Sequence, residues 1–253
     1  MKRNPLSTRF GSLWVAALFA MPSGSLAAAT VPEPPILSSD FIDAGPSIPT
    51  SHTSTIVETP EALLAAWVGG SRKGAVDTGI WLSRTESEGW SPPVEVANGT
   101  DRKKGRRLPC WNPVLFRRFN GDLLLFYKLG LTPENWQGMV RLSRDEGRTW
   151  LKVTRLPSGY IGPLRTKPIE LVDGLLVCGA GRRDRGWRVH AEYAYNPLRE
   201  WAKSSPLNHA SQFAATDPAV LQHEDDEIQF LCRTKQGWIT ECRSLDRALT
   251  WTP

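Results

Sequence analysis

The chain has 253 residues and a formal net charge of +5, from 31 basic and 26 acidic side chains. The first 29 positions hold three of the basic residues and no acidic one, which leaves 28 basic against 26 acidic residues, a charge of +2. So weak a charge gives no reason to expect a nucleic-acid partner. The remaining length is ample for one domain with a sizeable core.

An export signal is predicted at the N-terminus. A basic start is followed by an apolar run over 13–21 and then by small residues up to Ala29. This order is typical of a secretory signal peptide, and the apolar run is too short to span a membrane. We expect a signal peptide over 1–29, a linker or strand over 30–50, and a periplasmic or secreted protein without a membrane span.

Short apolar segments along the rest of the chain predict β-strands in sets of three. First strands are expected over 54–58, 112–116, 167–171 and 217–221. Second strands are expected over 63–68, 123–128, 175–180 and 228–233, and their nearly continuous apolar runs indicate burial on both faces. Third strands are expected over 78–84, 137–143, 190–195 and 238–244. No segment has a helical period, so the fold class is all-β.

An octapeptide follows two of the third strands. Residues 143–150 read S-x-D-x-G-x-T-W, and residues 244–251 repeat this pattern with Ala248 in place of glycine. Such a segment is typical of a hairpin tip, because Ser and Asp can bond turn amides and Gly accepts a positive φ. The residues expected to have this structural role are Ser143, Asp145, Gly147, Thr149, Trp150, Ser244, Asp246, Thr250 and Trp251.

Weaker copies of the octapeptide occur over 83–90 and 194–201. The closing tryptophans of the four copies are Trp90, Trp150, Trp201 and Trp251, and they are 60, 51 and 50 residues apart. A period near 50 predicts a repeat protein with one four-stranded blade per repeat. We expect about four blades over 51–253. Because unclosed blades expose strand edges, we also expect that the sequence is part of a longer propeller or that a partner copy completes the propeller.

Several short sequence segments together resemble those of a known family. These segments lie at 51–58, 77–81, 111–116, 125–128 and 162–169. With the octapeptide, which resembles the Asp-box or BNR repeat, they resemble a bacterial and plant branch of the sialidase-like β-propellers over roughly residues 45–253. Members are commonly described as exo-α-sialidases or BNR-repeat proteins. The resemblance implies a six-bladed propeller with its Asp-boxes on the rim away from the active face.

The first strand of each blade in a propeller lines a central channel, and ligands usually bind at one of its mouths. The repeat alignment places polar and aromatic strand tips there. The expected substrate-binding residues are His52, Trp111, Asn112, Lys128, Arg165, Lys167, Asp217 and Arg233. We predict that the cations hold acidic groups and that Trp111 forms a wall against a sugar, so the expected partner is a glycan or acidic oligosaccharide.

The resemblance also implies a chemistry: three arginines hold a sugar carboxylate, a glutamate activates a tyrosine nucleophile, and an aspartate is the acid/base. Asp77 is the expected acid/base and Glu192 the expected activator. The match is incomplete, because Thr53 occupies the first arginine position and the second falls just before Arg72, while Arg233 fits an arginine after a second strand better. No tyrosine nucleophile is assigned.

Three functions follow as alternatives. They are an exported glycoside hydrolase of exo-α-sialidase type, a non-catalytic glycan-binding or structural propeller, and a polysaccharide lyase-like propeller. No cofactor is expected, and no metal-ligand spacing occurs. Cys232 and Cys242 either pair across a hairpin or stay free. The basic loop over 98–109 is either a solvated surface or a contact for an acidic polysaccharide.

Overall fold

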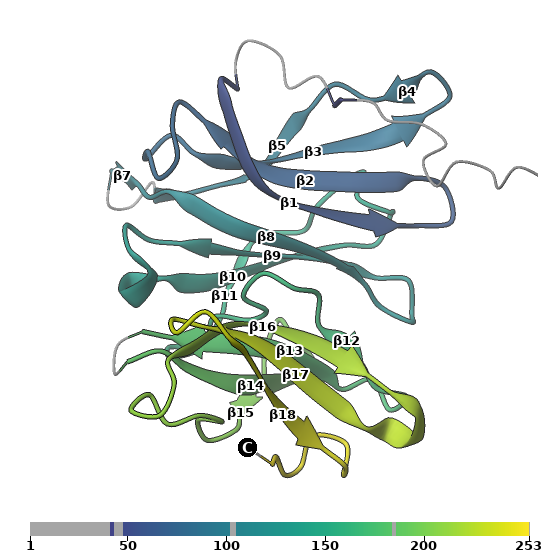
Figure 1. Cartoon of the computed structure of the whole chain (residues 1–253). Helices are drawn as coiled ribbons and strands as arrows, with labels where there is room; N and C mark the ends of the chain where they lie inside the picture. The colour runs from purple at the N-terminus through teal and green to yellow at the C-terminus, as the bar shows by residue number, and fades with distance from the viewer. Residues whose placement is uncertain (1–40, 43–47, 102–104, 184–185, 253) are drawn as a thin grey trace, which may run out of the picture. The chain divides into compact units, whose positions relative to one another are not determined.

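The computed structural model describes residues 41–42, 48–101, 105–183 and 186–252. Besides one two-stranded hairpin, the strands of these residues form four larger antiparallel sheets. They follow one another in chain order as the blades of a β-propeller (Figure 1). The all-β propeller of about four blades is therefore confirmed. The predicted signal peptide and most of the predicted linker lie outside the described residues. Within the described part, no helix has the length and apolarity needed to cross a membrane.

The strand bounds follow the predicted pattern, with a first, second and third strand in each blade. Blade 1 consists of β1 (Thr50–Glu58), β2 (Leu63–Gly70), β3 (Gly79–Glu86), β4 (Gly89–Trp90) and β5 (Val94–Asn98). Blade 2 consists of β8 (Cys110–Arg117), β9 (Leu123–Leu129), β10 (Gln137–Ser143) and β11 (Thr154–Arg155). Blade 3 consists of β12 (Ile169–Glu170), β13 (Leu176–Arg182), β14 (Arg188–Ala194) and β15 (Ala202–Lys203). Blade 4 consists of β16 (Ala215–Gln222), β17 (Ile228–Thr234) and β18 (Ile239–Ser244).

Three short elements connect these strands. They are the hairpin of β6 (Thr100–Asp101) with β7 (Arg106–Arg107) and the 3-10 turns η1 (Pro133–Asn135) and η2 (Glu224–Asp226). The outer strands β4, β5, β11 and β15 were not predicted from the sequence. They are two to five residues long, too short for a period of two to stand out.

The second strands are buried on both faces, and their alternation links neighbouring blades. In β9, Leu125 and Tyr127 pack in one cluster with Leu64 of blade 1, while Leu124 and Phe126 pack in another with Leu176 of blade 3. Side chains two apart share a face, so a single strand contributes to two cores. A third cluster joins blades 3 and 4 in the same way.

The Asp-box of blade 2 is a closed network of short hydrogen bonds. Asp145 accepts bonds from the Ser143 hydroxyl at 2.7 Å, from the Thr149 amide at 2.9 Å and from the Thr149 hydroxyl at 2.5 Å. Ser143 Oγ accepts the Gly147 amide at 2.8 Å. These bonds, led by that of the Thr149 hydroxyl, lower the pKa of Asp145 to about 2. The turn is therefore tied together by a permanently ionised carboxylate.

The blade 4 copy keeps this network although Ala248 replaces the glycine. Asp246 accepts bonds from Thr250, and Ser244 Oγ accepts the Ala248 amide at 2.8 Å. Ala248 adopts a φ of 69°, close to the 81° of Gly147. A Cβ at Gly147 would lie 2.4 Å from Leu64 of blade 1, so close packing between blades, more than φ, requires glycine there.

The cysteines, whose pairing the sequence did not decide, are free thiols. All four of Cys110, Cys178, Cys232 and Cys242 are buried and unpaired. Cys232 faces Thr240 across the β17–β18 ladder and Cys242 faces Phe230. The two cysteines are therefore not opposite each other in the hairpin, and no bridge forms between them.

A buried ion pair joins blades 2 and 3. Glu170 of β12 accepts bonds from Arg118 Nη2 at 2.6 Å and Arg118 Nε at 2.8 Å, and from the Phe119 amide at 2.7 Å. Only 3% of its side chain is exposed. Both carboxylate oxygens are engaged, so the pair is specific in geometry as well as in charge.

We predict that Glu170→Ala lowers the free energy of unfolding by about 3 kcal/mol, because it leaves a largely buried guanidinium without its partner. Urea denaturation followed by tryptophan fluorescence measures this change. Glu200→Ala is the control: Glu200 is exposed, and its loss should alter stability by no more than about 0.5 kcal/mol. Equal midpoints for the two variants would contradict the structural role of Glu170.

Candidate functional site

A β-bulge near the start of the first strand recurs in three blades. The register shifts lie between His52 and Ser54, between Trp111 and Val114, and between Thr216 and Ala219. The bulged residues Thr53, Asn112 and Asp217 have φ values of 52°, 44° and 51°. A left-handed backbone outside glycine costs on the order of 1–2 kcal/mol. Its repetition at equivalent positions marks these tips as a candidate site, since bulges re-aim side chains and strain often accompanies function.

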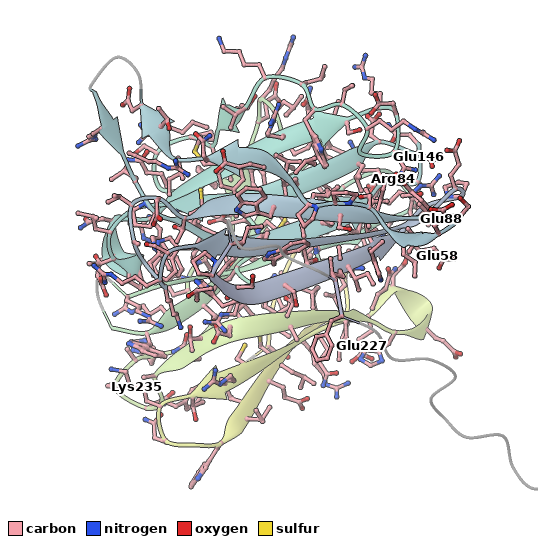
Figure 2. The ribbon with its side chains drawn as sticks, turned by 90° about the horizontal axis from the view of Figure 1, so that it is seen from above. Glu58, Arg84, Glu88, Glu146, Glu227 and Lys235 are labelled. Atoms are coloured by element: carbon pink, nitrogen blue, oxygen red, sulfur yellow. The ribbon has the colours of Figure 1, made fainter. Side chains whose placement is uncertain are left out.

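These tips lie at the opposite end of the strands from the Asp-boxes. In Figure 2, Glu58, Arg84, Glu88 and Glu146 gather on one side, and Glu146 belongs to the blade 2 Asp-box. Lys235 lies on the other side. Its amide bonds the Ala214 carbonyl at 3.0 Å, just before β16 begins. The bulges and the Asp-boxes therefore face different ends of the blades.

Two arginines from neighbouring blades meet at one carboxylate. Asp217 Oδ1 lies 3.4 Å from Arg165 Nε, and its Oδ2 lies 3.4 Å from Arg233 Nη1. The Asp217 side chain is 13% exposed, whereas those of Arg165 and Arg233 are 47% and 69% exposed. Guanidinium groups bind planar carboxylates in two-point geometry. The two exposed cations can thus hold an anionic ligand group beside Asp217.

An aromatic group from blades 1 and 2 adjoins these cations. The Trp111 ring is 6.2 Å from that of His52 and 5.6 Å from that of Trp136, and its Nε1 donates to the Gly130 carbonyl at 2.7 Å. Burial lowers the pKa of His52, and the charges of Lys73 and Arg165 lower it further. The charge of Arg165, which precedes blade 3, therefore acts on a strand tip of blade 1.

Two polar side-chain atoms at the bulges, Asn112 Nδ2 and His52 Nε2, have no hydrogen-bond partner among the described residues. Asn112 is 3% exposed and its Nδ2 makes no hydrogen bond; His52 Nε2 is enclosed in the same way. A buried polar group without a hydrogen bond costs about 1–3 kcal/mol. Asn112 and His52 can therefore donate to or accept from a ligand without giving up a bond inside the protein.

Glu192 lies in the interior beneath this site. It is fully buried, and its carboxylate accepts the Ile161 amide at 3.1 Å and the Gly162 amide at 2.8 Å. Its Oε1 is 2.9 Å from His190 Nε2. Among the described residues, no tyrosine hydroxyl bonds Glu192. The carboxylate fixes the segment that leads to Arg165, and its role as an activator of a nucleophile stays a prediction.

Lys128 is buried beside Glu192. Its Nζ donates to the Pro163 carbonyl and is fully enclosed. Burial lowers the pKa of Lys128 from 10.5 to about 7, although the charge of Glu192 opposes this change. Lys128 and Glu192 thus hold three consecutive residues of one loop, and Lys128 supports the site from below.

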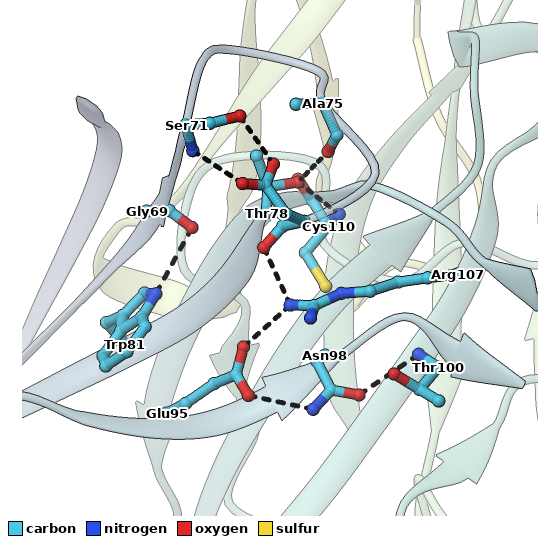
Figure 3. A network of polar contacts seen from close by, with 11 residues as sticks. Gly69, Ser71, Ala75, Thr78, Trp81, Glu95, Asn98, Thr100, Arg107 and Cys110 are labelled. Atoms are coloured by element: carbon cyan, nitrogen blue, oxygen red, sulfur yellow. Dashed lines mark hydrogen bonds and ion pairs between the residues drawn. The ribbon is translucent and has the colours of Figure 1, made fainter. Parts of the chain in front are cut away.

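The other predicted site residues, Asp77 and Lys167, lie at the edge of the candidate site. Asp77 is exposed and accepts bonds from the Ser71 amide at 3.0 Å and hydroxyl at 2.9 Å, which lower its pKa. It belongs to the β2–β3 loop, whose Gly74 approaches Trp111. Figure 3 shows the surrounding network, in which Arg107 joins this loop to Glu95. Lys167 is exposed and makes no hydrogen bond or ion pair with described residues.

Trp136 and His190 were not predicted from the sequence. Trp136 directly precedes β10, and Trp187 and Trp238 directly precede β14 and β18 at intervals of 51 residues, so the repeat spacing is the signal that could reveal it. His190 stands two residues before Glu192 on the same strand face, a spacing that can reveal such a pair. In the described part of the chain, no group of three or more His, Cys, Asp or Glu side chains could hold a metal ion.

The repeat signature decides the family. The family model of the BNR repeat-like domain matches residues 61–253. The chain belongs to this family. No curated protein has a significantly similar sequence.

Solved structures of sialidases have the same fold as this BNR-repeat protein. The Hadza microbial sialidase Hz136 superposes with a TM-score of 0.66 and 19% identity, over 80% of this chain and 46% of that one. The NanB sialidase of Streptococcus pneumoniae gives 0.64 and 11%, over 83% and 52%. The Trypanosoma rangeli sialidase in complex with sialic acid gives 0.62 and 14%, over 81% and 37%. The chain thus spans about half or less of these proteins, and the likeness establishes a sialidase-like fold.

We predict that the unfolding free energy rises with pH because of Lys128. A lysine whose pKa is lower in the folded state takes up a proton on unfolding. Stability therefore increases between about pH 7, the pKa of Lys128 in the folded chain, and about pH 10, the pKa of a lysine in the unfolded chain. Chemical denaturation of the wild type and Lys128→Met at a series of pH values measures the slope. The difference in stability between the two should shift in favour of the wild type as pH rises; parallel curves would contradict a buried, weakly basic Lys128.

Proposed function

We propose that this BNR-repeat protein is an exported glycoside hydrolase of exo-α-sialidase type, acting on terminal acidic sugars outside the cytoplasm. The observation that carries this function is the meeting of Arg165 and Arg233 at Asp217, beside the aromatic pair of His52 and Trp111. The first group supplies cations suited to a carboxylate, and the second supplies a flat ring suited to a sugar. Export is inferred from the order of residues at 1–29.

In this function Arg165 and Arg233 exchange part of their contact with Asp217 for the carboxylate of the sugar. Trp111 faces the ring, and Asn112 and His52 bond its polar groups. Asp77 is the proposed acid/base. Its lowered pKa keeps it ionised in the free protein, and an anionic sugar bound nearby raises the pKa of a carboxylic acid towards the range that proton donation needs.

A second candidate function is a glycan-binding propeller without catalysis. Thr53 occupies the place where the family resemblance implies an arginine, and Asp217 already offsets part of the charge of the two arginines that are present. These features leave a site that can bind an acidic sugar weakly. They supply no nucleophile among the residues assigned here.

We predict that Arg233→Ala and Arg165→Ala each lower kcat/KM for a fluorogenic α-sialoside by roughly tenfold to a hundredfold, since a hydrogen bond to a charged group contributes about 1.5–3 kcal/mol. The full chain is used for the assay. Arg144→Ala is the matched control, because Arg144 is an exposed arginine of the Asp-box end, and it should leave kcat/KM unchanged.

Asp77→Asn separates the two candidate functions. For a hydrolase, the substitution should lower kcat by about a hundredfold or more while glycan binding persists. For a glycan-binding propeller, the wild type shows no turnover, yet calorimetry with sialyllactose detects binding that Arg233→Ala weakens. If the wild-type chain neither turns over nor binds an acidic sugar, both candidate functions are contradicted.

A further inference from the structure

A second hollow lies between blades 1 and 2, away from the strand tips. We call it the interblade groove. One wall is β5 with the β6–β7 hairpin, and the other is formed by β9, β10 and β11. Its volume is about 820 Å³, within the range of small-molecule sites and large enough for more than one sugar ring. None of its lining residues belongs to the candidate site at the bulges.

The charge of the groove is positive. Four of its lining residues are cations: Arg106, Arg141, Lys152 and Arg155. The acids in the lining are Glu95 and Asp101. Glu95 is already engaged, by Arg107 at 2.9 Å and by the Asn98 side chain at 3.0 Å (Figure 3). Its negative charge is therefore largely offset before any ligand arrives.

Arg141 is a fixed cation in the wall. Its guanidinium donates to the Val96 carbonyl of blade 1, to the Leu151 carbonyl at 2.9 Å and to the Trp150 carbonyl at 2.7 Å. All three acceptors are neutral, and Arg141 forms no ion pair with a described carboxylate. A guanidinium has five N–H donors, so two remain for a ligand. The rigid position of the group lowers the entropy lost on binding.

The other three cations are unengaged. Arg106, Lys152 and Arg155 are exposed, and they form no ion pair or hydrogen bond with described residues. The lining also contains apolar side chains, among them Leu108, Met139 and Val153. Cations together with apolar surface suit a chain of sugar rings, which alternates anionic groups with C–H faces.

We propose that the interblade groove is a second binding site, for an oligosaccharide that carries carboxylate or sulfate groups. The site extends the basic loop noted in the sequence: Arg106 of that loop lines the groove and Arg107 holds Glu95 in its wall. Arg102, Lys103 and Lys104 of the loop lie outside the described residues. The groove retains a glycan whether or not the strand tips act on one.

The test is calorimetric titration of the full chain with tetrameric α2,8-linked sialic acid, with a heparin-derived tetrasaccharide and with neutral maltotetraose. Wild type and the double variant Lys152→Ala/Arg155→Ala are compared. The matched control is Arg144→Ala/Arg199→Ala, which removes the same charge from exposed positions without ion-pair partners among described residues. All substitutions are at exposed positions, so folding should be preserved.

We expect at least one anionic tetrasaccharide to bind the wild type, with affinity that falls as salt screens the charges. In the Arg233→Ala background, which weakens any binding at the strand tips, the groove variant should raise Kd about tenfold, while the control variant leaves Kd unchanged. Binding that persists in Arg233→Ala separates the groove from the proposed catalytic site. Which tetrasaccharide binds distinguishes carboxylate from sulfate.

Three outcomes would overturn the site. The first is that neither anionic tetrasaccharide binds. The second is an equal loss in the groove and control variants, which would mean that general charge attraction explains the binding. The third is equally tight binding of a single-stranded DNA oligomer with the same sensitivity to Lys152 and Arg155, which would point to polyanions in general.

Discussion

Burial of the second strands on both faces is the constraint on which the rest of this propeller depends. In β9, odd and even positions belong to two different cores, one shared with blade 1 and the other with blade 3. A slip by one residue would exchange all of these side chains between the cores. The register of each blade is therefore fixed by its neighbours, and so are the positions of the strand tips.

Fixed tips allow the structure to hold unfavourable geometry where a ligand is expected. Thr53, Asn112 and Asp217 keep a left-handed backbone at equivalent places, and two of them precede a proline that donates no bond to the ladder. The rigid cores supply the stability that offsets this strain. Beneath the tips, Glu192 and Lys128 bond the loop before Arg165 from the interior, so burial and site geometry are coupled.

The strands with strong apolar runs could be predicted from the sequence because their periodicity is dictated by the two cores. The repeat alignment likewise gave the equivalent positions Thr53, Asn112 and Asp217, which the structure places near strand starts. It could not show that Lys128 points inward, since a lysine after an apolar run is equally compatible with an exposed strand end. Trp136 was not predicted because a tryptophan directly before a third strand, a position that Trp187 and Trp238 also occupy, is equally compatible with packing at the rim.

The same tight packing has a chemical consequence for the four cysteines. Burial raises the pKa of every one of these thiols, and the nucleophile in sulfur exchange is the thiolate. The folded chain therefore offers almost no reactive sulfur to an oxidant or to another protein. A chain that is completely folded can therefore pass from a reducing to an oxidising environment without forming non-native disulfides that an isomerase would have to rearrange.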